Sequence, residues 1–493
     1  MAVAARVFGI RLLALAGIAC SEDPAPPPAA SAFRPNLIVV VVDDLRWDEF
    51  GAGGHPYLET PNIDRLAAEG AWFVNAFHAV PLCSPNRATL LTGQFPSRHG
   101  IIDNVSRSLA SHHLRTFPQA LQRSGYRTAF LGKWHMGNDP TPRPGFDYWV
   151  GLPGQGRSVD PEFFEDGKRQ VVRGYTTDLL TDRAIGFIER TGDTPFLVYL
   201  AHKAVHPDVV QRDDGSVDPE SDLGYVPAPR HRGRYQGRSF ERPAVDLAAD
   251  LGGKPAVAAA IARLPGAAGH EPGHFAPPWG GDETIQRRAE MILAVDEGLG
   301  RIMALLEERG ILDRTAIVLT SDNGYFFGEH GLTSERRLPY EESIRNPFLL
   351  RYPPAAPAGF RPGGLALTVD LAPTLLDLAG VDGGPGIQGR SLVPLLARPE
   401  PPADWRESVL VEFYTYENPF PHLLDMDYRA IRTGRFKYIH WVHHPDRDEL
   451  YDLEEDPREL RNLAGDPSHQ RVKQELRVEL GRLVLQAIGI PGS

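Results

Sequence analysis

The segment Asn36–Val42 limits the fold of this chain more than any other, because its Leu-Ile-Val-Val-Val-Val run lacks the polar alternation of a surface strand. Such a β-branched run is typical of a strand buried on both faces of a largely parallel sheet. Further apolar strands are predicted at 127–131, 195–200 and 316–320. Because helical patterns separate these strands, the sequence predicts an α/β fold with a large, mixed and mostly parallel sheet between helices.

The clearest of these helices is predicted from Glu283 to Arg309. Its apolar residues recur at helical spacing, and Gly310 follows as a residue suited to ending a helix. The apolar stripe consists of Ile292, Val295, Leu299, Ile302 and Leu306.

The length of the chain, 493 residues, exceeds what one ordinary core accommodates and predicts two or three domains. Residues 208–281 interrupt the rhythm with Gly, Pro, Arg and Asp, and we expect long loops with short helices there. From about Pro385 the pattern changes again. We predict a large domain over residues 34–388 and a smaller α+β domain over residues 389–493.

The smaller domain is predicted to be an antiparallel sheet with a helix. Residues 428–432 and 435–441 flank Thr433-Gly434 as the strands of a hairpin. Residues 449–453 add a further strand, and 470–487 form a terminal helix.

The N-terminal residues 1–20 have the character of a secretory leader. Arg6 and Arg11 precede the apolar stretch Leu12–Ala19, which is too short to span a bilayer. Secreted, periplasmic or surface-tethered protein is therefore the expectation, with a cytoplasmic protein as the alternative.

Ala19-Cys20 resembles a bacterial lipoprotein cleavage site, although Gly17 stands where a leucine is usual. A lipidated and an unlipidated Cys20 both stay open, and a lipid there is the only membrane attachment we expect. Residues 21–33, rich in Pro and Ala, are predicted to be an extended linker.

The net charge of −12 argues against sequence-independent nucleic-acid binding, which requires a basic face. It does not exclude an anionic substrate, because a local cationic pocket can exist in an acidic protein.

Cys83 is the only cysteine outside the leader, so after removal of Cys20 it has no partner for an internal disulfide. Three interpretations follow: a small buried hydrophobic residue, a reactive thiol, or the precursor of a more reactive group. The neighbouring residues favour a chemical role for Cys83 over that of a buried filler. Pro85 suits the first turn of a helix, and the free N–H groups of that turn favour an anion at Cys83. Arg87 lies on the same helix face and offers a fork of donors suited to a tetrahedral oxyanion.

Two acidic pairs follow predicted strands, Asp43-Asp44 after 36–42 and Asp322-Asn323 after 316–320. Ligands collect beyond the carboxyl ends of strands in open α/β sheets. Alone, each pair is more often a turn or a helix cap. Together, three carboxylates and an amide oxygen suit a hard divalent ion, calcium first and magnesium second.

Two further motifs place basic residues directly after strands: Gly132-Lys133-Trp134-His135 and Ala201-His202-Lys203-Ala204-Val205-His206. Taken alone, a Lys-x-His pair is more often a solvated lysine beside a satisfied histidine. His202 and Lys203 either line a substrate pocket or face solvent.

The stretch Cys-x-Pro-x-Arg followed by Ala-Thr-Leu-Leu-Thr-Gly resembles the signature of the type I sulfatases, in the alkaline phosphatase superfamily. The resemblance extends from about Asn36 to Leu463 and implies an alkaline-phosphatase-like fold. In that family a maturation enzyme converts the cysteine to Cα-formylglycine (3-oxoalanine), whose hydrated aldehyde is the nucleophile.

The resemblance also implies the site residues. Lys133 would grip sulfate oxygens, His135 would serve the formylglycine hydroxyls, and His206 would protonate the leaving oxygen. Arg87 would hold one hydroxyl. The implied ligands of the calcium ion are Asp43, Asp44, Asp322, Asn323 and the modified Cys83.

The loop Gly328–Ser343 departs from the family pattern, because it lacks the lysine that most sulfatases use to contact the sulfate. Counted back from Tyr340, Arg336 stands in its place. A guanidinium carries the same charge with a different reach.

The expected function is hydrolysis of sulfate esters on a glycosaminoglycan, mucin or algal polysaccharide, with an N-acetylhexosamine 6-sulfate favoured. The resemblance is to the branch that includes N-acetylglucosamine-6-sulfatases and mucin-desulfating enzymes. Two alternatives remain: a phosphonate or phosphate ester hydrolase of the same superfamily, and a surface protein that binds sulfated glycan without cleaving it. The expected partners are a sulfated saccharide and the formylglycine-generating enzyme.

Overall fold

A computed structural model describes residues 34–218, 224–241, 247–262, 281–332, 336–415 and 423–490. The chain from Arg34 onward forms one compact unit. The predicted leader and linker, residues 1–33, lie outside the described residues, so secretion and lipidation stay predictions. No helix in the described ranges combines the length and the apolar character that a bilayer crossing requires.

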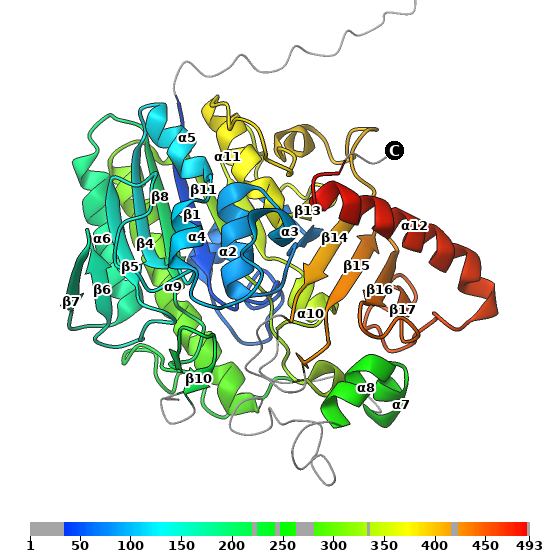
Figure 1. The fold of residues 1–493 in the computed structure, drawn as a ribbon. Helices are drawn as coiled ribbons and strands as arrows, with labels where there is room; N and C mark the ends of the chain where they lie inside the picture. The colour runs from blue at the N-terminus through cyan, green and yellow to red at the C-terminus, as the bar shows by residue number, and fades with distance from the viewer. Residues whose placement is uncertain are drawn as a thin grey trace, which may run out of the picture. The chain divides into compact units, whose positions relative to one another are not determined.

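The predicted sheet is confirmed as a mixed sheet of nine strands (Figure 1). Its central strands β11, β1, β8, β4 and β5 are parallel, and the outer strands on both sides are antiparallel. In spatial order the strands are β2 (Ala71–Phe73), β12 (Phe348–Arg351), β11 (Thr315–Ser321), β1 (Asn36–Val42), β8 (Phe196–His202), β4 (Arg127–Lys133), β5 (Tyr148–Leu152), β6 (Glu162–Glu165) and β7 (Lys168–Val171).

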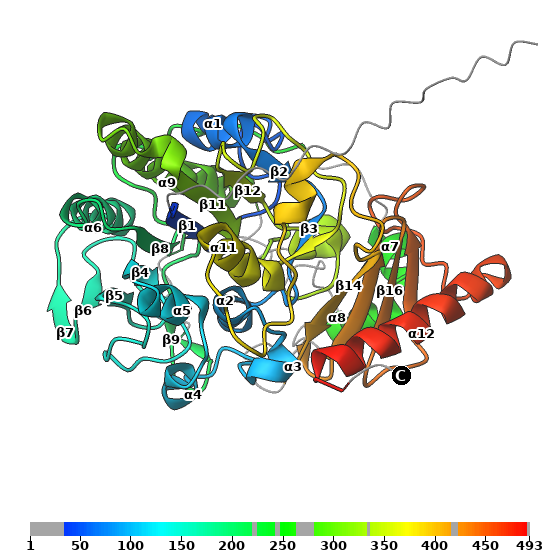
Figure 2. The ribbon, with the colours of Figure 1, turned by 90° about the horizontal axis from the view of Figure 1, so that it is seen from above.

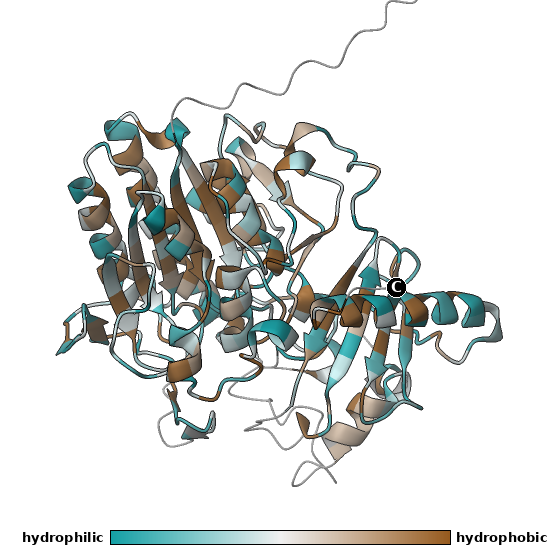
Figure 3. Ribbon diagram, turned by 45° about the horizontal axis from the view of Figure 1, so that its top comes forward, coloured by the Kyte–Doolittle hydropathy of each residue, from teal (hydrophilic) through white to brown (hydrophobic). Residues whose placement is uncertain are grey.

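Strand β1 is buried on both faces, as its sequence predicts. Ile38, Val40 and Val42 face one apolar layer, and the alternate residues Leu37 and Val39 face the other. Helices cover both faces (Figure 2), and the strands between them form an apolar band (Figure 3). The first layer contains α1 (Pro61–Glu69), α6 (Thr176–Arg190) and α9 (Asp282–Glu308), and the second contains α2 (Cys83–Thr92), α5 (Phe117–Arg123) and α11 (Leu371–Ala379).

Helix α9 confirms the amphipathic prediction within one residue at each end. All members of the predicted stripe are buried. Gly310, just beyond the helix, adopts a left-handed φ of 66° that few other residues tolerate.

A second sheet of four antiparallel strands confirms the predicted α+β part of the fold. One face packs against helix α12 (Gln470–Ala487) through Leu476 and Leu480. The other face packs against the loops of the large sheet, where Tyr428 and Trp441 join Phe77 and Tyr340 in one apolar cluster. The strands are β14 (Ser408–Phe413), β15 (Tyr428–Thr433), β16 (Phe436–Trp441) and β17 (Glu449–Asp452). The boundary between residues 388 and 389 stays a prediction.

The region 208–281 contains the expected short helices α7 (Leu247–Gly252) and α8 (Pro255–Ala262) among its described residues. It also contains an antiparallel pair that the sequence did not predict, β9 (Val210–Gln211) with β10 (Val217–Asp218). Within the described ranges the remaining short elements are β3 (Ala76–Phe77), β13 (Ala366–Leu367), α3 (Pro96–His99), α4 (Ser108–His112), α10 (Glu341–Ile344) and the 3-10 turns Leu312–Arg314, Glu329–Gly331, Thr368–Asp370, Val393–Ala397 and Pro467–His469.

Candidate active site

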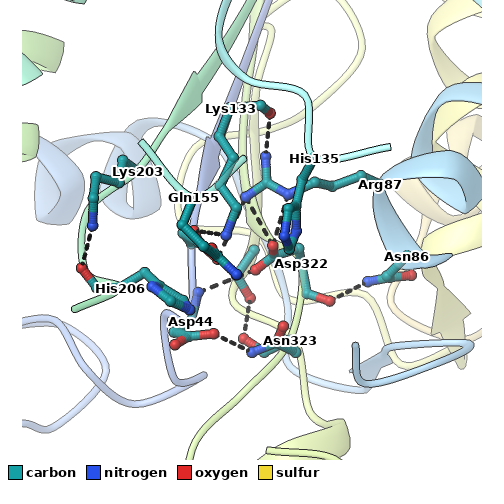
Figure 4. Close-up of polar contacts among 12 residues, drawn as sticks. Asp44, Asn86, Arg87, Lys133, His135, Gln155, Lys203, His206, Asp322 and Asn323 are labelled. Atoms are coloured by element: carbon teal, nitrogen blue, oxygen red, sulfur yellow. Dashed lines mark hydrogen bonds and ion pairs between the residues drawn. The ribbon is translucent and has the colours of Figure 1, made fainter. Parts of the chain in front are cut away.

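The candidate residues converge at the carboxyl ends of four adjacent parallel strands, β11, β1, β8 and β4 (Figure 4). The register pairs Val42, the last residue of β1, with both Ser321 of β11 and His202 of β8. The residues that follow each strand therefore emerge side by side, as expected for a ligand site at this edge of a sheet.

The two acidic pairs meet directly. The Asp322 carboxylate accepts a hydrogen bond from the backbone N–H of Asp44 at 3.1 Å, and Asn323 donates to the Asp44 carboxylate at 2.7 Å. Asp44 has a left-handed φ of 59°, which turns the chain sharply after β1. Asp43, Asp44 and Asp322 are fully buried.

Helix α2 brings Cys83 and Arg87 to this cluster. The helix begins at Cys83 itself, so the cysteine stands at the helix N-terminus as predicted. Arg87 donates from Nε to Asp322 Oδ2 at 2.8 Å and pairs with Asp43 Oδ1 at 3.5 Å. The ligand atoms of Cys83, Asp43 and Asp322 lie within 4.8 Å of one another.

Cys83 is a free, fully buried thiol. Burial raises its pKa to about 12, and the nearby Lys133 does not offset this effect. Because the thiolate is the nucleophilic form of cysteine, this upward shift argues against a reactive thiol at residue 83. Burial beside carboxylates and an arginine also sets it apart from an apolar filler.

Lys133, the last residue of β4, donates a hydrogen bond to Asp43. Its backbone carbonyl accepts from Arg87 Nη1 at 2.7 Å. Burial and the Asp322 carboxylate still raise the pKa of Asp43, although Lys133 and Arg87 act in the opposite direction. The cluster thus favours additional positive charge.

The donor set fits a hard divalent cation. Asp43 Oδ1 and Asn323 Oδ1 are buried and accept no hydrogen bond from the described residues. Carboxylate and amide oxygens are the ligands that calcium and magnesium prefer. Asp44 lies outside the three-atom group of Asp43, Cys83 and Asp322, but its backbone N–H donates to Asp322 and its carboxylate accepts from Asn323.

His135 lies just past Lys133 with a left-handed φ of 66°. Its carbonyl accepts a hydrogen bond from Ser84 Oγ at 2.6 Å, which ties it to the residue after Cys83. Its ring Nε2 contacts Gln211 Oε1 at 2.5 Å. Burial and the Lys133 cation hold its pKa well below the ordinary histidine value, so the ring is neutral.

His206 and Arg336 form a second contact pair at the site. Arg336 donates from Nη2 to His206 Nε2 at 3.0 Å and pairs through Nη1 with Asp44 Oδ2 at 3.1 Å. The structure therefore brings Arg336 beside a predicted metal ligand and a predicted proton donor.

The solvent-facing alternative for His202 and Lys203 is wrong. Both are buried, and burial lowers the pKa of His202 to about 4. Lys203 donates to the carbonyls of His206 and Pro207 at 2.8 and 2.9 Å and pairs with Asp208 at 2.8 Å. Its contacts hold the turn that carries His206.

Several supporting residues were not predicted from the sequence. Asn86, inside the cysteine motif, donates to the backbone carbonyl of Asp322 at 2.6 Å. Arg288 of α9 is fully buried, pairs with Glu49 at 2.6 Å and donates to the carbonyl of Asp44 at 2.7 Å. The position of Arg288 among buried residues of α9 could have indicated that it has a buried acidic partner. Gln211 gave no signal.

Comparisons with known proteins agree with this geometry. A family model described as sulfatase matches residues 35–381, and one described as N-sulphoglucosamine sulphohydrolase, C-terminal, matches residues 328–486. An N-acetylglucosamine-6-O-sulfatase of Bacteroides thetaiotaomicron is 35% identical over an alignment 521 residues long, gaps included. The alignment covers 94% of this chain and 88% of that protein. An ulvan-active sulfatase of Formosa agariphila is 27% identical, covering 91% of this chain and 81% of that protein.

A solved structure of a protein in complex with its substrate D-glucosamine-2-N,6-O-disulfate superimposes with a TM-score of 0.79. Its sequence is 33% identical, and the alignment covers 92% of this chain and 98% of the other. The family match over most of the chain, together with these relatives, shows that the chain belongs to the sulfatase family and is a sulfuric ester hydrolase.

Proposed function

We propose that this enzyme removes sulfate from sulfated glycans, with an N-acetylhexosamine 6-sulfate as the favoured substrate. We further propose that it acts with formylglycine made from Cys83 and with a bound calcium ion. The observation that carries the proposal is the burial of Cys83 within reach of Asp43 and Asp322, with Arg87 and Lys133 bonded to the same carboxylates.

The chemistry of a sulfate monoester explains these residues. Attack on sulfur brings an oxygen nucleophile toward an anionic group, and the leaving alkoxide is poor. Formylglycine would supply a hydroxyl nucleophile, and calcium held by Asp43, Asp44, Asp322 and Asn323 would neutralise anionic charge.

The cations of the chain itself bind and orient the sulfate. Lys133 and Arg336 are buried and each is paired with a carboxylate of the cluster. Because all of these groups are excluded from water, their interaction with an incoming anion is stronger than at an exposed surface. Arg87 holds the nucleophile at residue 83 in position through its bonds to the carboxylates on either side.

The leaving oxygen of the sugar needs a proton, and His206 is the residue we assign to this step. Lys203 and Asp208 hold the turn that carries it. A positioned general acid typically contributes about 10²- to 10⁴-fold to the rate.

The choice of substrate is supported by two comparisons. The Bacteroides protein is named for N-acetylglucosamine 6-O-sulfate, and the superimposed solved structure contains a 6-O-sulfated glucosamine. We also propose that the chain is exported, that a formylglycine-generating enzyme is its maturation partner, and that any membrane attachment is through Cys20.

The test uses protein coexpressed with a formylglycine-generating enzyme. The mass of the peptide containing residue 83 should be lower than that of the thiol form by about the mass of one water molecule. Free sulfate should be released from N-acetylglucosamine 6-sulfate faster than from N-sulfated, 2-O-sulfated or 4-O-sulfated sugars. Cys83→Ala is the control and should release none. Faster cleavage of a phosphonate monoester than of every sulfate would contradict the proposal, and an unmodified Cys83 with intact glycan binding would favour the binding-protein alternative.

A further inference from the structure

Gln211, in the short strand β9, touches the ring of a predicted catalytic histidine. Its side-chain amide lies between His135, Gln155 and the backbone of Gly215. The described contacts determine which end of the amide faces each neighbour, and therefore which nitrogen of His135 carries a proton.

The orientation of the Gln211 amide follows from its partner on the far side. Nε2 of Gln211 donates to the carbonyl oxygen of Gly215 at 2.7 Å, and a carbonyl can only accept. The NH₂ end therefore faces Gly215. The oxygen end faces His135 at 2.5 Å and also accepts from Gln155 Nε2 at 2.8 Å.

An amide oxygen only accepts hydrogen bonds, so the His135 nitrogen that contacts it must donate. Nε2 of His135 consequently carries the hydrogen. In a neutral imidazole the other nitrogen, Nδ1, is then bare, and it is buried without a hydrogen-bond partner among the described residues.

We propose that Gln211 is a positioning residue that fixes His135 as the Nε2–H tautomer, leaving Nδ1 as the proton acceptor for a hydroxyl on residue 83. This inference rests on the proposed function, because the hydroxyl belongs to formylglycine. The proton that leaves the hydroxyl goes to Nδ1, while Nε2 keeps its own hydrogen. Gln211 Oε1 then accepts from the imidazolium and stabilises it.

The hydrogen bond from Ser84 to the His135 carbonyl supports the assignment of Nδ1 as the proton acceptor. It holds His135 next to the N-terminus of α2, where residue 83 lies. With its carbonyl fixed by Ser84 and Nε2 fixed by Gln211, Nδ1 is the nitrogen left for the reacting group.

The test replaces Gln211 by methionine, which has a similar size and no amide oxygen. With ¹⁵N-labelled histidine, the Nε2 and Nδ1 resonances of His135 report which nitrogen is protonated. They are assigned by comparison with His135→Gln. We expect the parent to show only Nε2–H and Gln211→Met to show both tautomers. We expect kcat to fall by roughly 3- to 10-fold, the worth of one hydrogen bond, with KM within about twofold.

The matched control is Asn138→Ala. Asn138 braces the same loops by donating to Asp213 at 2.6 Å and accepting from the N–H of Gly154 at 2.8 Å, and neither of these hydrogen bonds involves the His135 ring. It should leave the tautomer unchanged and kcat within about threefold of the parent, the scale of a single lost hydrogen bond. A second variant, Gln211→Glu, keeps an acceptor oxygen, and Nε2 should stay protonated in it.

Two results would overturn the proposal. One is a parent protein in which His135 carries its hydrogen on Nδ1, and the other is a Gln211→Met variant with an unchanged tautomer. The tautomer is measured without turnover and without modified Cys83. A parent that releases no sulfate but shows the Nε2–H form would therefore contradict the proposed function alone.

Discussion

Arg336 donates a hydrogen bond from Nη2 to Nε2 of His206 across 3.0 Å. Because a guanidinium has no acceptor, Nε2 of His206 is bare and Nδ1 donates to the Pro207 carbonyl at 2.8 Å. Burial, Lys133 and Arg336 hold the pKa of His206 well below its ordinary value. His206 is therefore neutral before substrate arrives. The assigned role as proton donor therefore requires that His206 gain a proton when an anionic sulfate binds beside Arg336.

Replacing His206 by asparagine tests this role in proton donation. Asparagine can still donate to Pro207 but cannot protonate a leaving group. We expect kcat on a sugar sulfate to fall by about 100-fold or more. On an aryl sulfate, whose leaving group needs little protonation, the fall should be under about tenfold. Equal losses on both substrates, measured as kcat, would contradict the assignment.

The acidic cluster predicts a dependence on calcium for both activity and stability. A ligand at about 100 times its Kd stabilises the folded state by about 2.7 kcal/mol. Chelation should abolish turnover and lower Tm, and calcium should restore both more effectively than magnesium. Asp322→Asn should lose the calcium-dependent rise in Tm.

A second cluster of ligand-type side chains, His330, Glu342 and Glu459, provides the control. Lys437 already pairs with Glu459 Oε1 at 2.6 Å, so we place no cation there. Glu342→Gln should keep the calcium response. If Glu342→Gln loses it and Asp322→Asn retains it, the metal site has been assigned to the wrong cluster.

His330 predicts a loss of stability at alkaline pH. Burial opposes its charge, but the Asp250 and Glu342 carboxylates raise its pKa to about 9, against 6.5 for an ordinary histidine. Because the folded-state pKa is the higher one, the stabilisation is complete below about pH 6.5 and is lost as pH rises through 9. The difference corresponds to about 3 kcal/mol.

His330→Gln measures this contribution. Its free energy of unfolding should fall furthest below that of the parent near pH 6, and the gap should close toward pH 10. Urea unfolding at several pH values follows the gap directly. A gap that widens with pH would reverse the sign of the argument.

Lys437 should contribute strongly to stability because it is fully buried among charged partners. It pairs with Glu341 at 3.0 Å and with Glu459, and it donates to the Pro339 carbonyl at 3.0 Å. Lys437→Met leaves two buried carboxylates without this cation and should cost about 3–5 kcal/mol. Thermal or urea unfolding measures the loss.

Arg435→Met is the matched control on the adjoining turn. Arg435 is half-exposed and pairs with Asp452 at 2.6 Å. An exposed pair of this kind is worth about 1 kcal/mol or less. Similar losses in the two variants would show that burial of the Lys437 network does not determine its contribution.

Sequence patterns predicted the parts of the structure in which neighbouring residues carry the signal. The apolar run Asn36–Val42 identified the central strand, and the pairs that follow the strands identified the acidic cluster. These predictions succeed because a parallel sheet places successive carboxyl ends at one edge.

Contacts across long sequence separations could not be predicted in this way. Gln211 meets His135 across 76 positions, and Arg288 meets Glu49 across 239. Lysine is usually a surface residue, and only the contacts of Lys203 with the turn around His206 show why it is buried. In each case the contact depends on how a loop packs, and loop packing produces no periodic pattern in the sequence.

The contacts of the four-stranded sheet with the segment after Arg336 limit how this enzyme can be recombined. Tyr428 donates to the carbonyl of Arg337 at 2.8 Å, and Lys437 donates to that of Pro339. Consider a chimaera that joins about the first 400 residues of this chain to the remainder of a homologue. It would take Arg336 from one parent and the residues that support its loop, Tyr428 and Lys437, from the other. The segment after Arg336 and the four-stranded sheet should therefore be inherited together, and crossovers that separate them should be selected against.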